Sequence, residues 1–139
     1  LSIGIWTGAM KERSVVEPAY LLDANICIYL LEGKSDLAAA RVSACPVGQL
    51  VTSAVVYAEV MIGARRLDRA DRALAFFGQV PVLPFDAAAG DAYSHLPFRR
   101  GSYDRLIAAN ALALGLTVVT SNDADFADVP GLKVENWTV

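Results

Sequence analysis

The sequence predicts an α/β protein with a mainly parallel sheet. Short apolar runs alternate along the 139-residue chain with longer segments of helical periodicity. Hydrophobic residues make up 55% of the chain and charged residues 19%, so a sizeable core is available. Residues 116–120 are apolar almost throughout, which is typical of a strand buried on both faces. We therefore expect one domain built around such strands.

Five short apolar runs are the expected strands. Each is bounded by turn-forming residues, and each is short enough to be a buried strand. Pro81 falls in the third run, and because proline cannot donate to a sheet ladder, that strand should be short or lie at an edge. The runs are residues 20–22, 49–52, 80–83, 116–120 and 132–134.

The segments between these runs are expected to be helical. Ser53 and Ser102 are good N-caps for two of them, and Gly115 supplies the left-handed residue that ends a helix. Gly33, Pro46, Gly78 and Pro97 are further stop signals. The expected helices cover residues 26–31, 37–44, 54–66, 68–77, 86–96, 102–114 and 123–127.

Composition excludes several classes of protein. The net charge of −3 argues against nucleic-acid binding through a broad basic surface, although Arg99 and Arg100 form a local basic pair. His95 is the single histidine, which excludes a histidine-rich zinc site. Cys27 and Cys45 lack metal-ligand spacing and are most simply thiols of a reducing cytosol, so we expect a cytoplasmic protein. No apolar run approaches the ~18 residues of a membrane span, and no membrane association is expected.

Residues 1–19 differ from the rest of the chain. They lack the cationic start and long apolar centre of a signal peptide. We expect this leader to be a tag, an upstream start or a disordered arm, and the folded domain to cover residues 20–139.

Polar side chains follow two of the expected strands directly. Asp23 comes after the first strand, and Asn122 and Asp123 come after the fourth. Ligands of such sheets bind at the carboxyl ends of the strands. Both positions therefore point to the same edge of the sheet.

Two further carboxylates lie on the buried faces of expected helices. Glu59 shares a helical stripe with Val56 and Val60, and Asp104 shares one with Ile107. A carboxylate on an inward face is costly unless it is paired, hydrogen-bonded or bound to a metal. Gathered carboxylates would raise one another's pKa, and a divalent cation would remove that conflict. Oxygen ligands favour Mg²⁺ or Mn²⁺ over Zn²⁺.

Each of these residues also has a simpler explanation. Asp104 would complement the dipole of its helix, and Asp23 would stabilise a turn. Glu59 would lie at the flank of its stripe and reach water, and Asp123 would be an N-cap. Taken singly, these explanations are the stronger ones. Taken together at one sheet edge, the four positions favour a metal site.

The chain resembles the PIN-domain ribonucleases, and among them the VapC-type toxins of bacterial toxin–antitoxin pairs. Four segments with their order and spacing carry the likeness, which extends from about residue 20 to the C-terminus. They are LLDAN at residues 21–25, TSAVVYAEVMIGAR at 52–65, YDRLIAANALALG at 103–115 and VTSN at 119–122.

The resemblance implies a three-layer α/β/α sandwich with a mainly parallel sheet of four to five strands. It implies a Mg²⁺- or Mn²⁺-dependent endoribonuclease whose catalytic positions fall on Asp23, Glu59, Asp104 and Asn122. Asp23 and Asp104 would hold the main ion, Glu59 would orient or deprotonate water and could share a second ion, and Asn122 would hold a water ligand, with Asp123 or Asp125 able to substitute for it.

The resemblance also implies partners. These are a cognate antitoxin, an RNA substrate and a second copy of the chain. The helical surfaces at residues 38–44 and 67–77 are candidates for the homodimer contact. Arg99 and Arg100 precede Asp104 and could meet substrate phosphates, although solvated surface arginines are an equally good explanation.

Two other functions compete. Aspartyl-phosphate chemistry needs a second Asp two residues after Asp23, but Asn25 occupies that position. A degenerate domain that binds RNA or protein without cleavage is the stronger alternative, because Ala24 stands where the family often has Thr and Asn122 is neutral.

Overall fold

β1 is the central strand of a parallel five-stranded sheet in the computed structural model, which describes residues 16–139. The strand order is β3-β2-β1-β4-β5, and each neighbouring pair is parallel. Residues 1–15 of the expected leader lie outside the described residues, and the Ala19 amide donates to the Gln49 carbonyl. The strands are β1 (Tyr20–Leu22), β2 (Leu50–Ser53), β3 (Val82–Leu83), β4 (Thr117–Thr120) and β5 (Val134–Asn136).

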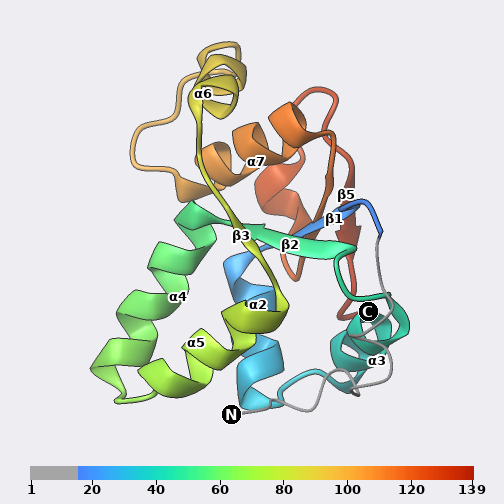
Figure 1. The fold of residues 1–139 in the computed structure, drawn as a ribbon. Helices are drawn as coiled ribbons and strands as arrows, with labels where there is room; N and C mark the ends of the chain where they lie inside the picture. The colour runs from blue at the N-terminus through green and yellow to red at the C-terminus, as the bar shows by residue number, and fades with distance from the viewer. Residues whose placement is uncertain (1–15) are drawn as a thin grey trace.

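Helices cover both faces of this sheet, which confirms the predicted three-layer α/β class. In Figure 1, α2, α4 and α5 lie on one side of the sheet, and α6 and α7 on the other. The helices are α2 (Ala24–Glu32), α3 (Asp36–Ala44), α4 (Ala54–Arg66), α5 (Ala70–Gln79), α6 (Ala87–Ser94), α7 (Tyr103–Leu114) and the 3₁₀ helix η1 (Asp123–Phe126).

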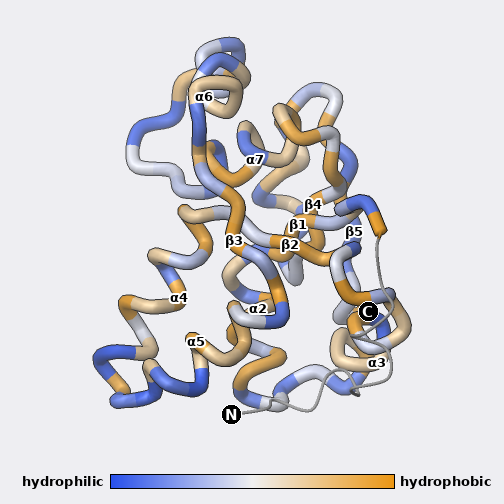
Figure 2. The backbone as a smooth tube through the Cα atoms, in the orientation of Figure 1, coloured by the Kyte–Doolittle hydropathy of each residue, from blue (hydrophilic) through white to orange (hydrophobic). Residues whose placement is uncertain are grey.

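The core lies along the two central strands. Leu21, Leu22, Val118 and Val119 are completely buried, as the apolar character of these runs predicted. In Figure 2 the strands in the middle of the molecule are hydrophobic, whereas the outer turns of the surrounding helices are hydrophilic. The last buried aromatic residue, Trp137, packs edge-on against Tyr20, with ring centroids 5.0 Å apart. This contact attaches the C-terminal segment to β1.

Several element boundaries differ from the prediction. α5 continues through Gly78 to Gln79, because burial of Phe76 and Val80 outweighs the poor helix propensity of glycine. The last strand starts at Val134, where it pairs with Val118, instead of at Leu132, whose amide closes a turn onto Val129. The helix α6 ends at Ser94, whereas the prediction extended this helix to residue 96.

His95, predicted to lie in the middle of a helix among apolar residues, is instead the exposed C-cap of α6. Its Nδ1 atom lies 2.9 Å from the Asp91 carbonyl oxygen. This local contact is consistent with a structural role for the only histidine of the chain.

Replacing Ser102 with Ala is expected to lower the free energy of unfolding by about 1 kcal/mol. The Ser102 hydroxyl accepts a hydrogen bond from the Arg105 amide and caps α7, as predicted. Urea unfolding followed by circular dichroism measures the change. Ser43→Ala is the control, because the exposed Ser43 hydroxyl contacts only the Ala40 carbonyl of its own helix. Equal midpoints for the two variants would contradict the capping role.

Candidate metal centre

The carboxyl ends of β1, β2 and β4 meet at one edge of the sheet, as all strands are parallel. β1 lies between β2 and β4, so the strand order runs outward from β1 in opposite directions, through β2 and β3 on one side and through β4 and β5 on the other. Such a switch in strand order opens a crevice at the carboxyl edge. α2 and α4 begin directly at this edge, after β1 and β2, and η1 begins there after β4.

Asp23 stands at the centre of this edge. It is the N-cap of α2, and its Oδ1 accepts a hydrogen bond of 2.8 Å from the Ala24 amide. Its Oδ2 accepts one of 2.9 Å from the Thr120 hydroxyl at the end of β4. Only 5% of Asp23 is exposed, and this burial is the main reason that its pKa is raised despite the two hydrogen bonds. Asp23 thus caps a helix, where the simpler explanation had expected it to stabilise a turn, and capping alone leaves unexplained why a carboxylate is buried here.

Glu59 and Asp104 lie close enough to Asp23 to feel its charge. Burial, then the charges of Asp23 and Asp104, raise the pKa of Glu59 to about 7. Burial, then the charges of Asp23 and Asp125, raise the pKa of Asp104 to about 6, partly offset by Arg99. Within residues 16–139, the buried Oε1 atom of Glu59 has no hydrogen-bond partner. Helix α4 thus places a buried, unsatisfied carboxylate oxygen within electrostatic reach of Asp23.

The fourth position involves Asn122 and Asp125 together. The Asn122 amide donates to the Thr120 hydroxyl at 3.0 Å, and its side-chain Nδ2 donates to Asp125 Oδ2 at 2.9 Å. The charge of Asp125 contributes to the raised pKa values of both Asp23 and Asp104. Asn122, not Asp123, is the residue that precedes η1 as its N-cap. Of the three alternatives left by the sequence, Asp125 is thus the one whose charge acts on Asp23 and Asp104, and which residue completes the site stays a prediction.

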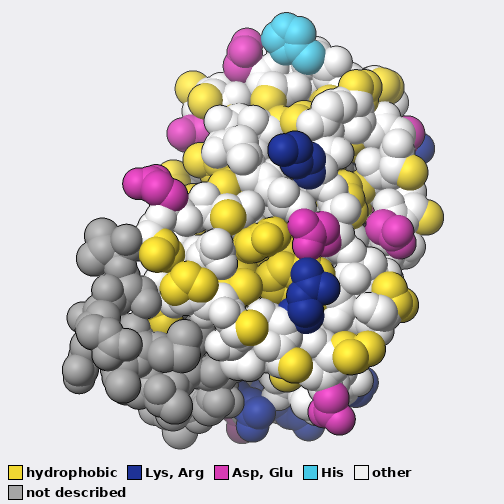
Figure 3. All heavy atoms as spheres, turned by 90° about the vertical axis from the view of Figure 1, so that its right-hand side faces the viewer, with side chains coloured by type: hydrophobic (Ala, Val, Ile, Leu, Met, Phe, Trp, Pro, Cys, Tyr) yellow, Lys and Arg dark blue, Asp and Glu magenta, His cyan; other side chains and the backbone are white. Residues whose placement is uncertain are grey.

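The two arginines expected to meet phosphates lie in different surroundings. Arg99 pairs with Asp128 at 3.0 Å and lowers the pKa of Asp104 through its charge. The Arg100 guanidinium lies 5.8 Å from the centroid of the exposed Phe98 ring. Arg99 is thus near the carboxylates. On the face shown in Figure 3, Lys and Arg side chains are dispersed and form no broad basic surface, as the net charge indicated.

The donor set fits a hard divalent cation by its chemistry, because it consists of carboxylate and amide oxygens with one buried oxygen left unpaired. In residues 16–139, however, no three His, Cys, Asp or Glu side chains are arranged closely enough to hold a metal ion. Carboxylates repel one another when no cation lies between them. The ligand set Asp23, Glu59 and Asp104 therefore stays a prediction.

Sequence reasoning missed the contacts around these carboxylates. Thr120 joins Asp23 to the η1 segment, and its polar side chain at the end of an apolar strand was the available signal. Arg105, next to Asp104, has a side chain that is only 4% exposed, and its charge is paired with Asp128. Nothing in the sequence pattern distinguishes Arg105 from a surface arginine.

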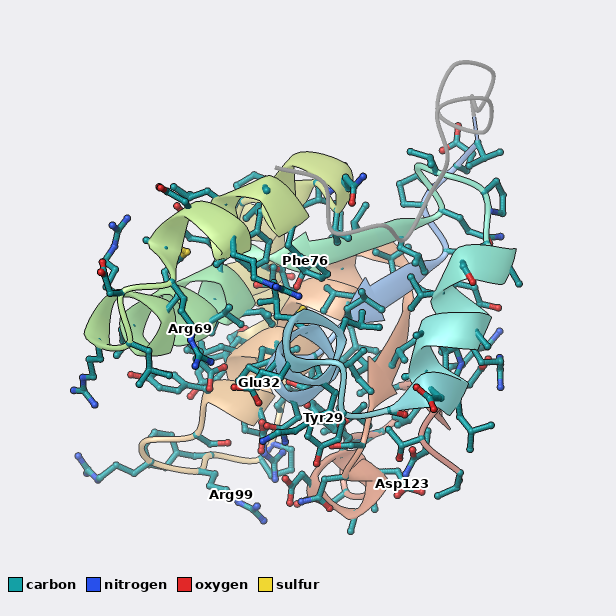
Figure 4. The ribbon with its side chains drawn as sticks, turned by 90° about the horizontal axis from the view of Figure 1, so that it is seen from below. Tyr29, Glu32, Arg69, Phe76, Arg99 and Asp123 are labelled. Atoms are coloured by element: carbon teal, nitrogen blue, oxygen red, sulfur yellow. The ribbon has the colours of Figure 1, made fainter. Side chains whose placement is uncertain are left out.

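A hollow of about 760 Å³ borders the site between α2, α4 and α5. Its floor is mainly apolar, with Ile28, Leu31 and Val60, and Glu59 lines it. Glu32 and Arg69 form an ion pair at its rim, 3.8 Å apart, and Figure 4 shows them side by side.

No helix in the described part of the chain is long and apolar enough to cross a membrane.

Comparison with known proteins identifies the family of the chain. The PIN domain family model matches residues 20–132. The "tRNA(fMet)-specific endonuclease VapC" of Shigella flexneri is 32% identical, covering 86% of this chain and 98% of that protein. The DNA-bound VapBC structure from Salmonella typhimurium has a TM-score of 0.76 at 28% identity, covering 86% of this chain and 98% of that chain. The VapBC-1 structure from nontypeable Haemophilus influenzae has a TM-score of 0.72 at 29% identity, covering 87% and 99%. The chain therefore belongs to the PIN-domain family and, within it, to the VapC proteins.

Proposed function

We propose that this chain is an endoribonuclease, the toxin of a toxin–antitoxin pair, and that it needs Mg²⁺ or Mn²⁺ to cut RNA phosphodiester bonds. The observation that carries the proposal is the placement of Asp23, Glu59 and Asp104 near one sheet edge, where burial and then the charge of Asp23 raise the pKa of both Glu59 and Asp104. VapC relatives named as ribonucleases or endonucleases support the reaction class. RNA is a cytoplasmic substrate, so we place the activity in the cytoplasm.

Asp23 and Asp104 are the residues proposed to hold the main ion, and Asp125 is proposed as the fourth oxygen ligand. Asn122 keeps Asp125 in place through its hydrogen bond of 2.9 Å. When bound, a divalent cation supplies charge neutralisation at phosphorus and lowers the pKa of water. One ion or two would suit these residues.

Glu59 is proposed as the general base. Its pKa of about 7 matches the operating pH of a cytoplasmic enzyme, and its free Oε1 atom is available to accept a proton from the attacking water. Arg99, at the edge of the site, is proposed to contact the phosphate next to the one that is cut. Arg100 would add a weaker and more exposed contact.

A cognate antitoxin is the proposed inhibitor. The solved structures that this chain resembles include VapBC from Salmonella typhimurium and a toxin–antitoxin complex from Klebsiella pneumoniae. We propose that an apolar segment of the antitoxin covers the hollow between α2, α4 and α5 and directs a basic side chain toward Glu59. A homodimer is proposed as well, since Leu37 on α3, Leu67 at the end of α4 and Leu74 on α5 are exposed.

RNA cleavage by the purified chain is expected to require Mg²⁺ or Mn²⁺ and to stop in EDTA. Glu59→Gln is expected to slow cleavage by roughly 10²-fold, because loss of a general base typically costs 10²–10⁴-fold. Cleavage of a labelled RNA on gels measures both effects. Glu135→Gln is the control, since Glu135 pairs with Arg41 on α3, away from the carboxylates. RNA binding without cleavage under every metal condition would instead favour the degenerate module.

A further inference from the structure

A buried arginine connects the two segments that supply the third and fourth carboxylates. Arg105 lies in the first turn of α7, next to Asp104. Its Nη2 donates to Asp128 Oδ2, just beyond the end of η1, and the same oxygen accepts a hydrogen bond of 3.0 Å from Arg99. Within the described residues, the buried Nη1 of Arg105 has no partner. The charge of Arg105 is therefore balanced through Asp128.

This ion pair holds the η1 segment at its C-terminal side. At the other side, the Asn122 amide is bound to the Thr120 hydroxyl, which also donates to Asp23. Asp125 lies between these two attachment points. The negative charges of Asp23 and Asp104 repel Asp125, and the Arg105–Asp128 pair and the Asn122–Asp125 hydrogen bond are attractive contacts that oppose this repulsion.

We propose that Arg105 and Asp128 are positioning residues, which hold η1 against α7 so that Asp125 stays within reach of a metal ion bound by Asp23 and Asp104. The inference rests on the proposed function of the site. Asp128 does not touch the metal; it acts through the backbone of η1. Because one partner is buried, the pair is geometrically constrained in a way that exposed ion pairs are not.

The test is Mn²⁺ binding to the full-length, metal-free chain, measured from the loss of the aqueous Mn²⁺ signal in electron paramagnetic resonance. Asp128→Asn is expected to weaken Mn²⁺ affinity roughly 10-fold, as is typical when a residue that orients metal ligands is removed. Arg105→Lys keeps the charge but not the forked geometry, and it is expected to weaken affinity similarly. Thermal unfolding shows which variants are folded. If Arg105→Lys does not fold, Asp128→Asn alone tests the proposal.

Asp125→Asn provides the second arm. Once Asp128→Asn has released η1, removing the Asp125 carboxylate as well is expected to weaken Mn²⁺ affinity little further. In the double variant, the two losses of affinity should therefore not multiply. Glu135→Gln, which removes another half-exposed carboxylate paired with an arginine, should leave affinity unchanged. If the effects of Asp128→Asn and Asp125→Asn on Mn²⁺ affinity multiply, they reflect a simple effect of charge and the proposal is overturned. The same holds if Asp128→Asn weakens Mn²⁺ binding while folded Arg105→Lys binds Mn²⁺ like the parent chain.

Asp23→Asn separates this inference from the proposed function. If Asp23→Asn abolishes Mn²⁺ binding while Asp128→Asn binds like the parent chain, the metal site stands and the positioning role is wrong. If the parent chain itself binds no Mn²⁺, or if Asp23→Asn binds as well as the parent chain, the proposed metal site is wrong, and the positioning role falls with it.

Discussion

Asp23→Asn is expected to reduce RNA cleavage by roughly 10³-fold, the largest effect of any single substitution in this chain. A metal ion contributes several kcal/mol of charge stabilisation in the transition state, and each 1.4 kcal/mol or so corresponds to a factor of ten in rate. Asp23 is the most buried of the four carboxylates, and the hydrogen bond from Thr120 fixes its orientation. Its loss should therefore remove the main ligand. Single-turnover cleavage at saturating Mg²⁺ measures the effect.

The same substitution should leave the fold intact or stabilise it. Asparagine retains an Oδ1 atom that can accept the hydrogen bond from the Ala24 amide, so the α2 cap survives. It also removes a charge that is costly to bury. Asp86→Asn is the matched control, because Asp86 caps α6 through the Ala89 amide and lies in no proposed ligand set. If both variants cleaved RNA at the parental rate, Asp23 would be a structural cap and the proposed metal site would be wrong.

Much of the fold was predictable because local signals agree with the tertiary structure. Ser53 and Ser102 cap α4 and α7, and Gly33 and Gly115 end α2 and α7 in left-handed conformations, as the sequence indicated. The errors fell where packing overrides local preference. Gly78 was expected to end a helix, but the helix continues because its flanking residues Phe76 and Phe77 are buried.

The candidate site was predictable in its ligand types but not in its supporting contacts. Strand ends and helical stripes were enough to propose Asp23, Glu59 and Asp104, whose role as ligands stays a prediction. The choice between Asn122, Asp123 and Asp125 depends on how η1 turns after β4, which only the three-dimensional structure provides. The Arg105–Asp128 pair spans 23 residues of sequence, so no local pattern indicates it.

The metal-free protein is expected to lose stability as the pH rises from about 4 to about 7. Glu59 and Asp104 have ordinary pKa values of 4.5 and 3.8, and the fold raises them to about 7 and about 6. At these two groups the native state therefore binds more protons than the unfolded state in this range, so their contribution to stability is fully present below about pH 4 and is lost as both become ionised. Because both groups are partly solvated, we expect a total of about 1 kcal/mol, or about 3 °C in Tm.

Scanning calorimetry between pH 4 and pH 8 in EDTA measures this dependence. Glu59→Gln should flatten the upper part of the curve, because glutamine does not titrate, whereas Glu135→Gln should leave that part unchanged. Mn²⁺ should raise Tm most at pH 8, where the carboxylates are ionised and bind the cation without first losing protons. A Tm that rose with pH in EDTA, or a Mn²⁺ effect larger at pH 5 than at pH 8, would show that these carboxylates are not crowded together in the folded protein.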